Sequence, residues 1–431
     1  MSRIRIAAAA AVLALVAALV PGMRPALALP RNERVYVANS ASDTVSVIDV
    51  ETNGVIATIP VGDRPTGVLE IGDRVYVTNE LSGTVSVIAV GADTVFATVP
   101  VGVRPAGLDV DAYIREVWVA NEGSNSVSVI SIATNTVIDT VPVGIAPHGI
   151  SFSFHGERVY VTSQSDTVSV IDVYDRDLVA SVPVGHTPTA IAAPVFVDSK
   201  IYVTNQSSNT VSVLDRASNT VMKTIPVGTL PTDAVVLSPV TLLVANKGSN
   251  TISVIDMASD TVVETWSAVQ PHGIGVSPAY DRMYAAGMGP TGGVVTVLDA
   301  GTGETVATVP VGDFPEGVAV AVVPPPVISG QTWFTSGTKS LVVPAGSQVA
   351  LYAVGAVQGM PYQLTLSHPS DWPCSSRFAV LNPATVIPGP SGLIGRVRAT
   401  IPLGTPAGNY TICFRHTLGS TATGVVALTV V

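Results

Sequence analysis

The sequence predicts an all-β protein in which a seven-bladed β-propeller with four-stranded blades is followed by a small β-sandwich. Two observations predict the propeller. A stretch of about forty residues recurs seven times, and a strand left over at one end of the array matches a strand missing at the other. A third observation predicts the sandwich, because short alternating apolar runs follow a proline-rich stretch at residues 324–328.

The repeat is clearest in residues 74–107, where the runs VYVT, TVSVIAV and TVFATVPVG are separated by Asn, Ser, Gly and Asp. Runs rich in β-branched residues between such turn formers are typical of short antiparallel strands. A fourth strand begins at Pro105. Four strands of this length bury too little surface to be stable alone, so each repeat should stack against its neighbours.

Two markers recur in phase at intervals of 40 to 44 residues. One is the large residue at the centre of the first strand, and the other is the proline that opens the fourth strand. The first set is Tyr36, Tyr76, Trp118, Tyr160, Tyr202, Leu243 and Tyr284, and the second is Pro65, Pro105, Pro147, Pro188, Pro231, Pro271 and Pro315.

The ends of the array predict a closed ring. The first strand, residues 35–39, has no proline strand before it, whereas the last repeat continues beyond Pro315. Pairing of residues 317–322 with residues 35–39 would complete a composite blade and leave no open sheet edge.

Polar residues recur where strands end. An Asn that closes the first strand is expected to favour a tight turn, because Asn tolerates left-handed backbone geometry. An Asp that follows the second strand is expected to stabilise a turn rather than to bind calcium. The asparagines are Asn39, Asn79, Asn121, Asn205 and Asn246, and the aspartates are Asp49, Asp172, Asp215, Asp256 and Asp299.

The N-terminus predicts export. Arg3 and Arg5 precede an apolar stretch at residues 6–20, and an Ala-Leu-Ala site ends at Ala28. Residues 1–28 are therefore expected to be a secretory signal peptide cleaved after Ala28. A retained membrane anchor is the alternative, but the stretch is shorter than the roughly 20 residues that span a bilayer. We expect a secreted or cell-surface protein that is not an integral membrane protein after cleavage.

Composition and motifs exclude several functions. The net charge is −10, and the acidic residues gather in the repeats, so the propeller should repel nucleic acid. The sequence contains no CxxCH heme attachment motif, no GxxxxGK[ST] phosphate loop and no GxSxG nucleophile elbow.

The phrases VYVTN at 75–79, IYVTN at 201–205, TVSVID at 44–49 and TVPVG-x-x-P at 98–105 resemble the YVTN-repeat β-propellers of bacterial and archaeal secreted and surface-layer proteins. The resemblance covers residues 33–323 and implies that the fourth strand of each repeat lines a central channel, with its opening loop at one mouth. Related propellers include surface proteins, lactonases, streptogramin lyases and parts of redox enzymes, so it indicates the fold far better than the function.

If the proline strands line the channel, the residue after each proline contributes to a belt near one mouth. Streptogramin lyases place His, Glu and a metal ion at their mouth, so the similarity makes His148, His272 and Glu316 candidate catalytic residues. A divalent metal is the cofactor that these side chains could hold, although no local metal motif supports it. The alternative is that these residues have no catalytic role, because a solvent-filled channel tolerates polar side chains. The belt is Thr66, Ala106, His148, Thr189, Thr232, His272 and Glu316.

Further candidate ligand-binding residues adjoin this belt. Arg64 and Arg104 precede two of the prolines and could clamp an anion, or Arg64 could simply balance Asp63. Asp233 follows the belt residue Thr232, and both are ligand-binding candidates, as are the belt residues Thr66 and Thr189. His155 and His186 lie off the belt and are expected to be loop or surface residues.

We divide the mature chain into a propeller at 29–323, a linker at 324–328 and an immunoglobulin-like β-sandwich at 329–431. At least six antiparallel strands are expected there, at 340–343, 348–352, 363–366, 396–401, 409–414 and 425–430. Residues 406–413 resemble a penultimate strand of immunoglobulin-like domains in bacterial surface proteins, except that Tyr410 precedes Cys413 by three residues instead of two.

Cys374 and Cys413 are the two cysteines of the chain. In an exported protein they should form a disulfide, worth roughly 4 kcal/mol in the chain-entropy model. Two free thiols are the alternative.

Two functions follow. The first is a non-catalytic binding, adhesion or envelope scaffold module that recognises a protein, a glycan or a small molecule. The second is a metal-assisted lyase or lactone hydrolase whose site lies at the channel mouth.

Overall fold

The computed structural model describes residues 33–323, apart from 112–113, 154–156, 195–198 and 280, and the backbone of strands between 327 and 430. These strands fall into two units, one of Asn32–Pro324 and one that includes Pro325–Val431, and each is described by itself. No helix in the described part of the chain is long and apolar enough to cross a membrane.

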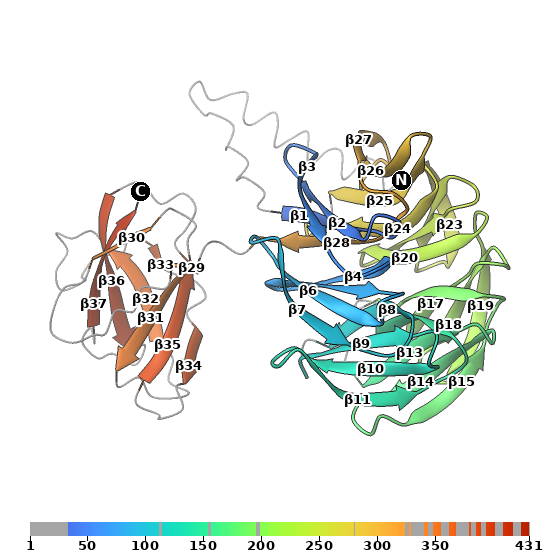
Figure 1. The fold of residues 1–431 in the computed structure, drawn as a ribbon, viewed down its shortest axis with the longest axis horizontal. Coiled ribbons are helices and arrows are strands. Elements are labelled where there is room, and N and C mark those ends of the chain that lie inside the picture. The colour runs from blue at the N-terminus through green and yellow to red at the C-terminus, as the bar shows by residue number, and fades with distance from the viewer. Residues whose placement is uncertain are drawn as a thin grey trace. The chain divides into compact units, whose positions relative to one another are not determined.

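The first unit is a seven-bladed β-propeller, and each blade is a four-stranded antiparallel sheet (Figure 1). From the channel outwards, the first blade contains β28 (Pro315–Val322), β1 (Glu33–Asn39), β2 (Thr44–Asp49) and β3 (Gly54–Pro60). The second contains β4 (Pro65–Ile71), β5 (Arg74–Asn79), β6 (Thr84–Ala89) and β7 (Thr94–Pro100), and the third β8 (Pro105–Asp111), β9 (Glu116–Asn121), β10 (Ser126–Ser131) and β11 (Thr136–Pro142).

The remaining four blades repeat this order. The fourth contains β12 (Pro147–Phe152), β13 (Arg158–Ser163), β14 (Thr167–Asp172) and β15 (Leu178–Pro183), and the fifth β16 (Pro188–Ala192), β17 (Lys200–Asn205), β18 (Thr210–Asp215) and β19 (Thr220–Pro226). The sixth contains β20 (Pro231–Ser238), β21 (Thr241–Asn246), β22 (Thr251–Asp256) and β23 (Thr261–Ser267), and the seventh β24 (Pro271–Val276), β25 (Arg282–Gly289), β26 (Gly292–Asp299) and β27 (Thr305–Pro310).

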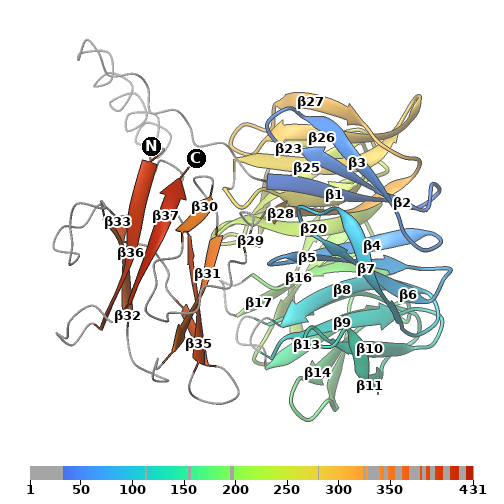
Figure 2. The same ribbon diagram turned by 60° about the vertical axis from the view of Figure 1, so that its left-hand side comes forward.

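Closure by a composite blade is confirmed. Strand β28 pairs antiparallel with β1, so that Val320 lies opposite Val35 and Val318 opposite Val37. Figure 2 shows β28 beside β1 although they come from opposite ends of the propeller sequence. The last strand therefore hydrogen-bonds the first and completes the first blade, so the array has no open end.

Apolar cores lie between adjacent blades. One core packs Tyr36 and Val45 of the first blade against Val75 and Val77 of the second. The Tyr36 hydroxyl reaches across this interface and donates a hydrogen bond to Asp93 Oδ1 at 2.7 Å. The aromatic marker thus recurs because it fills the space between blades and links them at the rim.

The predicted role of the strand-closing asparagines is wrong. Asn39 and Asn79 are fully buried and remain within their strands instead of adopting left-handed geometry. The Asn79 amide donates to Thr84 Oγ1 at 2.9 Å and to Ser86 Oγ at 3.0 Å. These asparagines tie the first strand to the second, and the left-handed residue comes later in the turn, as at Asp43 with φ of 54°.

The turn role of the recurring aspartates is confirmed. Asp49 Oδ1 accepts hydrogen bonds from the backbone N–H and the hydroxyl of Thr52, both at 2.8 Å. Asp215 Oδ1 accepts the same pair from Ser218 at 2.7 and 2.8 Å.

The second unit contains two sheets. Pairs β29–β31 and β30–β37 are parallel, which the expected antiparallel sandwich did not include. The side chains of Cys374 and Cys413 lie outside the described residues, as do residues 1–28 and His155, so the disulfide, the signal peptide and the place of His155 stay predictions. The sheets are β29 (Val327–Ile328), β31 (Gln348–Val354), β35 (Ile394–Thr400) and β34 (Thr385–Pro388), and β30 (Ser340–Val343), β37 (Gly424–Val430), β36 (Gly408–His416), β32 (Tyr362–Ser367) and β33 (Ala379–Val380).

Candidate functional site

The channel mouth is built by the loops that lead from each outer strand to the inner strand of the next blade. The residue before each ring proline adopts left-handed geometry, with φ of 53° at Arg64 and 50° at Phe314. This is unfavourable for a residue with a side chain, and hydrogen bonds hold it in place. The Arg64 N–H donates to Asp43 Oδ1 at 2.8 Å, and the Arg64 carbonyl accepts the N–H of Glu80 at 2.9 Å.

The belt residues lie where the sequence pattern placed them. A cavity of about 200 Å³ in the channel is lined by the belt positions and the residues after them, from all seven inner strands. A second cavity of about 220 Å³ lies at the mouth and shares the belt with the first. All three candidate catalytic residues, His148, His272 and Glu316, line both cavities.

Glycines directly after the belt residues keep the channel narrow. A Cβ atom on Gly273 would lie 1.9 Å from the carbonyl oxygen of Glu316 in the next blade. On Gly149 it would lie 2.1 Å from the carbonyl oxygen of Thr189. Neighbouring inner strands can therefore approach this closely only where the side chain is absent.

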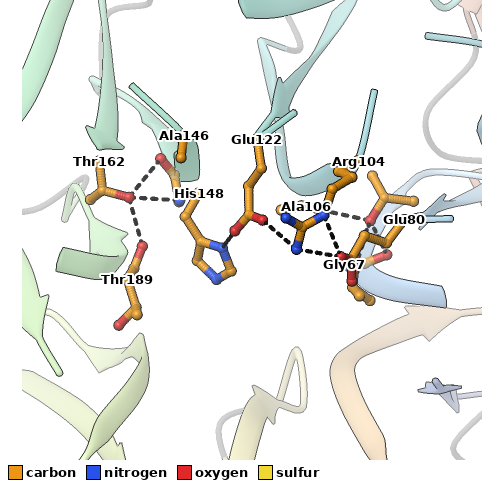
Figure 3. Close-up of polar contacts among 12 residues, drawn as sticks. Gly67, Glu80, Arg104, Ala106, Glu122, Ala146, His148, Thr162 and Thr189 are labelled. Atoms are coloured by element: carbon orange, nitrogen blue, oxygen red, sulfur yellow. Dashed lines mark hydrogen bonds and ion pairs between the residues drawn. The ribbon is translucent and has the colours of Figure 1, made fainter. Parts of the chain in front are cut away.

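A chain of charged side chains crosses one half of the mouth (Figure 3). Glu80, which is only 7% exposed, lies 3.1 Å from Arg64 Nε and 2.7 Å from Arg104 Nη2. Arg104 Nη2 also lies 3.1 Å from Glu122 Oε2. Glu122 Oε1 in turn lies 2.7 Å from His148 Nδ1. The network joins the second, third and fourth blades, and Arg64 pairs with Glu80 rather than with Asp63.

In the hydrogen bond between Glu122 and His148, the histidine is the donor. Burial alone would raise the pKa of Glu122, but the hydrogen bond with His148 and the charges of His148, Arg104 and Arg64 outweigh burial and lower it. An ionised Glu122 accepts a hydrogen bond, so Nδ1 of His148 carries the proton and donates it. Within the described part of the chain, Nε2 of His148 has no hydrogen-bond partner, and Figure 3 shows it turned away from Glu122.

The opposite side of the belt holds the second histidine. Burial, together with the charges of Lys247 and His148, lowers the pKa of His272 to about 3. His272 is therefore neutral at physiological pH. Burial raises the pKa of Glu316, although a hydrogen bond from Ser40 and the charge of Arg64 offset part of the increase.

Other predicted ligand-binding residues make bonds within and between the blades. Asp233 accepts the backbone N–H of Ile274 in the next blade at 2.8 Å. The Thr232 hydroxyl donates to the His272 carbonyl at 2.8 Å. The hydroxyls of Thr66 and Thr189 form hydrogen bonds with the hydroxyls of Thr78 and Thr204, which lie on the adjacent strand of the same blade. These side chains line the channel, but their polar groups serve the fold.

Sequence reasoning missed Glu80, Glu122 and Lys247. All three directly follow a strand-closing Asn, at 79, 121 and 246. This position is as periodic as the belt and would have revealed a second ring of variable residues. By contrast, His186 lies off the belt as expected, with 78% of its side chain exposed and its Nδ1 2.7 Å from Asp166.

A metal site gains no support from clustering. Across the residues that the structure describes, no group of three or more His, Cys, Asp or Glu side chains converges closely enough to hold a metal ion.

Comparison with protein families gives one match. The model described as Cytochrome D1 heme domain matches residues 116–354. A comparison with curated proteins gives no match.

Solved structures share the fold. A functionally unknown protein from Desulfotomaculum acetoxidans DSM 771 has a TM-score of 0.58 and 17% identity, covering 67% of this chain and 98% of that one. Hydrazine synthase from Kuenenia stuttgartiensis has a TM-score of 0.53 and 21% identity over 59% and 89%. Dihydro-heme d1 dehydrogenase NirN, in complex with DHE, has a TM-score of 0.51 and 16% identity over 70% and 78%.

The matched family implies a heme, and the mouth can be tested for one. The donor chemistry suits an iron ligand, because a carboxylate holds Nδ1 of His148 and leaves Nε2 toward the cavity. The cradle does not suit a heme. The two cavities that His148 lines, of about 200 and 220 Å³, are smaller than the roughly 300–1,000 Å³ of small-molecule pockets, and a tetrapyrrole needs the upper part of that range. A larger cavity of about 520 Å³ at the mouth is lined by Arg64 and Glu316 but not by either histidine of the belt.

The walls also oppose a heme. At Gly149 and Gly273 the inner strands approach the neighbouring backbone so closely that a Cβ atom would clash, which keeps the channel narrow at the belt. The guanidinium groups of Arg64 and Arg104, which could pair with heme carboxylates, already bind Glu80. The residues present therefore do not fit a heme.

Proposed function

Because this chain belongs to the cytochrome D1 heme domain family, whose cofactor its channel mouth does not fit, we propose that it is a propeller that binds a small polar molecule at that mouth instead of a heme. The single observation that carries the proposal is the imidazole of His148, held by Glu122 with its Nε2 left unpaired among the described residues.

Three features of the mouth support a binding role. The network from Arg64 to His148 fixes the charged side chains before a ligand arrives, which lowers the entropy lost on binding. Gln164 and Gln206, from the fourth and fifth blades, add neutral amide side chains to the lining of the same cavity. The cavity of about 220 Å³ is below the usual range for drug-sized ligands, so it suits a smaller polar molecule.

The wider role rests on resemblance. The YVTN-like repeats and the immunoglobulin-like strand pattern favour an exported protein that acts at the cell surface or outside the cell. Under this proposal the propeller is the recognition module, and the second unit is an accessory domain. An adhesion or envelope scaffold role has only this resemblance to support it.

The binding role can be tested by thermal unfolding in a library of small polar molecules, with hemin included. We expect at least one compound to raise the melting temperature of the wild type and to have no effect on His148→Ala. His186→Ala is the matched control, because His186 makes the same 2.7 Å contact with a carboxylate outside the mouth. A library without effect on the wild type would contradict the proposal.

A second candidate function is hydrolysis or elimination, and the Glu122–His148 pair favours it. In a lactone hydrolase, Nε2 of His148 would take a proton from water as the water oxygen attacks the carbonyl carbon. The ring C–O bond would then break, and the proton on Nε2 would pass to the leaving oxygen to give a hydroxy acid. Glu122 would stabilise the imidazolium between these steps.

This candidate has its own test. Lactone opening followed by proton release should be lost in His148→Ala and retained in His186→Ala. A wild-type rate equal to the buffer rate would remove the enzymatic role and leave the binding role intact.

A further inference from the structure

One carboxyl group at the channel mouth has no positive partner. Three glutamates line the mouth cavity of about 220 Å³, and two of them are neutralised there. Glu80 pairs with two arginines at 3.1 and 2.7 Å, and Glu122 pairs with one arginine and with His148. The third, Glu316, forms no ion pair with any basic side chain that the structure describes, and its polar partner is the neutral hydroxyl of Ser40.

Glu316 also lines a third cavity, which is separate from the belt histidines. This third cavity has a volume of about 520 Å³. It lies between the first two blades, because Asp43 comes from the turn after β1 and Leu81 from the turn after β5. Its volume is within the roughly 300–1,000 Å³ of small-molecule sites. The third cavity can therefore hold a larger ligand than the two cavities that His148 lines.

The third cavity combines the Glu316 carboxyl group with apolar side chains. Phe314 and Leu81 line it and are 55% and 64% exposed. Their backbones are held in place, since the Phe314 carbonyl accepts the N–H of Ser40 at 2.9 Å and the Leu81 N–H donates to the carbonyl of Asp63 at 3.2 Å. An exposed aromatic ring and an exposed leucine in one cavity favour a ligand with an apolar part.

The other charges around the third cavity favour a cation. Asp43 and Asp63 line it and are exposed, and neither forms an ion pair with a described residue. One oxygen of Asp43 accepts the backbone N–H of Arg64 at 2.8 Å. The guanidinium group of Arg64 also lines the cavity, but it lies 3.1 Å from Glu80, which neutralises it. The third cavity is therefore negative overall and should attract cations and repel anions.

We propose that the third cavity binds a small organic ammonium ion, with the ammonium group at Glu316 and the apolar group against Phe314 and Leu81. An ammonium group would donate charge-assisted hydrogen bonds to the carboxylate. A positive charge near the ring of Phe314 would gain further from a cation–π contact. Burial disfavours the ionised form of Glu316, and a cation beside it offsets this cost. The site goes beyond the proposed function, because its ligand does not need His148.

The test is calorimetric titration of the full chain at pH 7 with benzylamine and with benzyl alcohol. The two molecules have the same shape, but the amine is protonated at this pH. We expect benzylamine to bind at least about tenfold more tightly than benzyl alcohol, since a charge-assisted hydrogen bond is roughly twice as strong as a neutral one. Equal affinities, or no binding of the amine, would overturn the inference.

Glu316→Gln locates the ammonium group, because glutamine keeps the length of the side chain and removes its charge. This variant should reduce the affinity for benzylamine to the affinity for benzyl alcohol. Glu157→Gln is the matched control, because Glu157 is 65% exposed and does not line the cavity, so it should bind the amine as the wild type does. Equal losses in both variants would mean that the amine responds to the net charge of −10, which would overturn the site.

Two further variants test the site even if Glu316→Gln does not fold. Asp63→Asn changes an exposed side chain and should weaken the binding of benzylamine about threefold. Phe314→Leu should weaken it about two- to fivefold through loss of the aromatic ring. Unchanged affinity in both variants would contradict the site. Binding that depends on these residues would support it even if no ligand depended on His148, so this inference and the proposed function can fail separately.

Discussion

Nδ1 of His148 donates a hydrogen bond to Oε1 of Glu122 over 2.7 Å, and the two residues belong to neighbouring blades. The same carboxylate receives Arg104 at 3.1 Å, so its position is fixed from two sides. The pair gives the mouth an imidazole with a defined proton position, which is what ligand binding or proton transfer requires.

Glu122→Gln should weaken the response to any ligand that depends on His148. A neutral amide cannot accept a charge-assisted bond from Nδ1 and loses the ion pair with Arg104, so we expect about a tenfold loss of affinity. Calorimetric titration with a compound that stabilises the wild type would measure it. Asp166→Asn is the control, because it breaks the exposed His186–Asp166 pair. Equal losses in both variants would show that the position of the carboxylate at the mouth does not matter.

Gly273→Ala should destabilise the propeller. The added Cβ would lie 1.9 Å from the Glu316 carbonyl oxygen, so the inner strands of two blades must separate. We expect a loss of about 1–3 kcal/mol or more in the free energy of unfolding, measured with urea. Gly301→Ala is the matched control, because its nearest neighbour would be Asp299 Oδ1 at 3.4 Å. If the two variants unfolded at the same denaturant concentration, the close packing of the throat would be contradicted.

Ring closure predicts the effect of truncation. A chain that ends after Glu316 loses most of β28 and exposes the edge of β1, whereas a chain that ends after Val323 keeps the pair. The shorter chain should unfold at a markedly lower temperature, because the core between the first and seventh blades contains Val320. Equal melting temperatures by circular dichroism would mean that the composite blade adds nothing to stability.

His272 predicts how stability depends on pH. Its pKa in the folded state, about 3, is below the ordinary value of 6.5, so the unfolded chain binds the proton more tightly. Titration of His272 therefore does not reduce the free energy of unfolding above pH 6.5. As the pH falls toward 3, it reduces the free energy of unfolding by up to about 4 kcal/mol. His272→Gln should reduce the loss of stability on acidification, as measured by urea unfolding between pH 7 and pH 4.

Asp109 should have the opposite effect on how stability depends on pH. Burial raises its pKa to about 6, although the N–H groups of Phe152 and Val110 oppose this. The folded chain binds this proton more tightly, so the contribution of Asp109 is complete below about pH 4 and is lost as the pH rises through 6. Asp109→Asn should therefore make stability increase more steeply with pH from 4 to 6. If the free energy of unfolding depended on pH in the same way in His272→Gln and in Asp109→Asn, the assigned pKa values would be contradicted.

The fold was predictable because every blade buries the same faces against its neighbours. Tyr36 and its counterparts fill equivalent spaces, and the same side chains therefore recur at equal intervals. Closure of the ring was predictable because the array of repeats lacks one strand at its start and has one extra strand at its end. The role of Asn39 was not predictable from turn chemistry, because its partners Thr44 and Ser46 are side chains of the next strand.

The site was only partly predictable. The prolines marked the belt and the resemblance to known propellers placed it at the channel mouth, so His148, His272 and Glu316 were found before the structure. Glu122 was missed because its importance depends on which belt residue of the next blade lies beside it, and this is set by the stagger of blades around the ring. Thr232 and Asp233 line the channel as expected, yet the sequence did not reveal that inter-blade bonds occupy their polar groups.

The central claim is that this member of the heme-domain family holds a small polar ligand where a heme does not fit. Titration of the wild type and of His148→Ala with hemin, followed by the absorbance of the Soret band, tests it most directly. We predict the same weak and non-saturating absorbance in both proteins. A Soret band that saturates at one heme per chain in the wild type and disappears in His148→Ala would contradict the account.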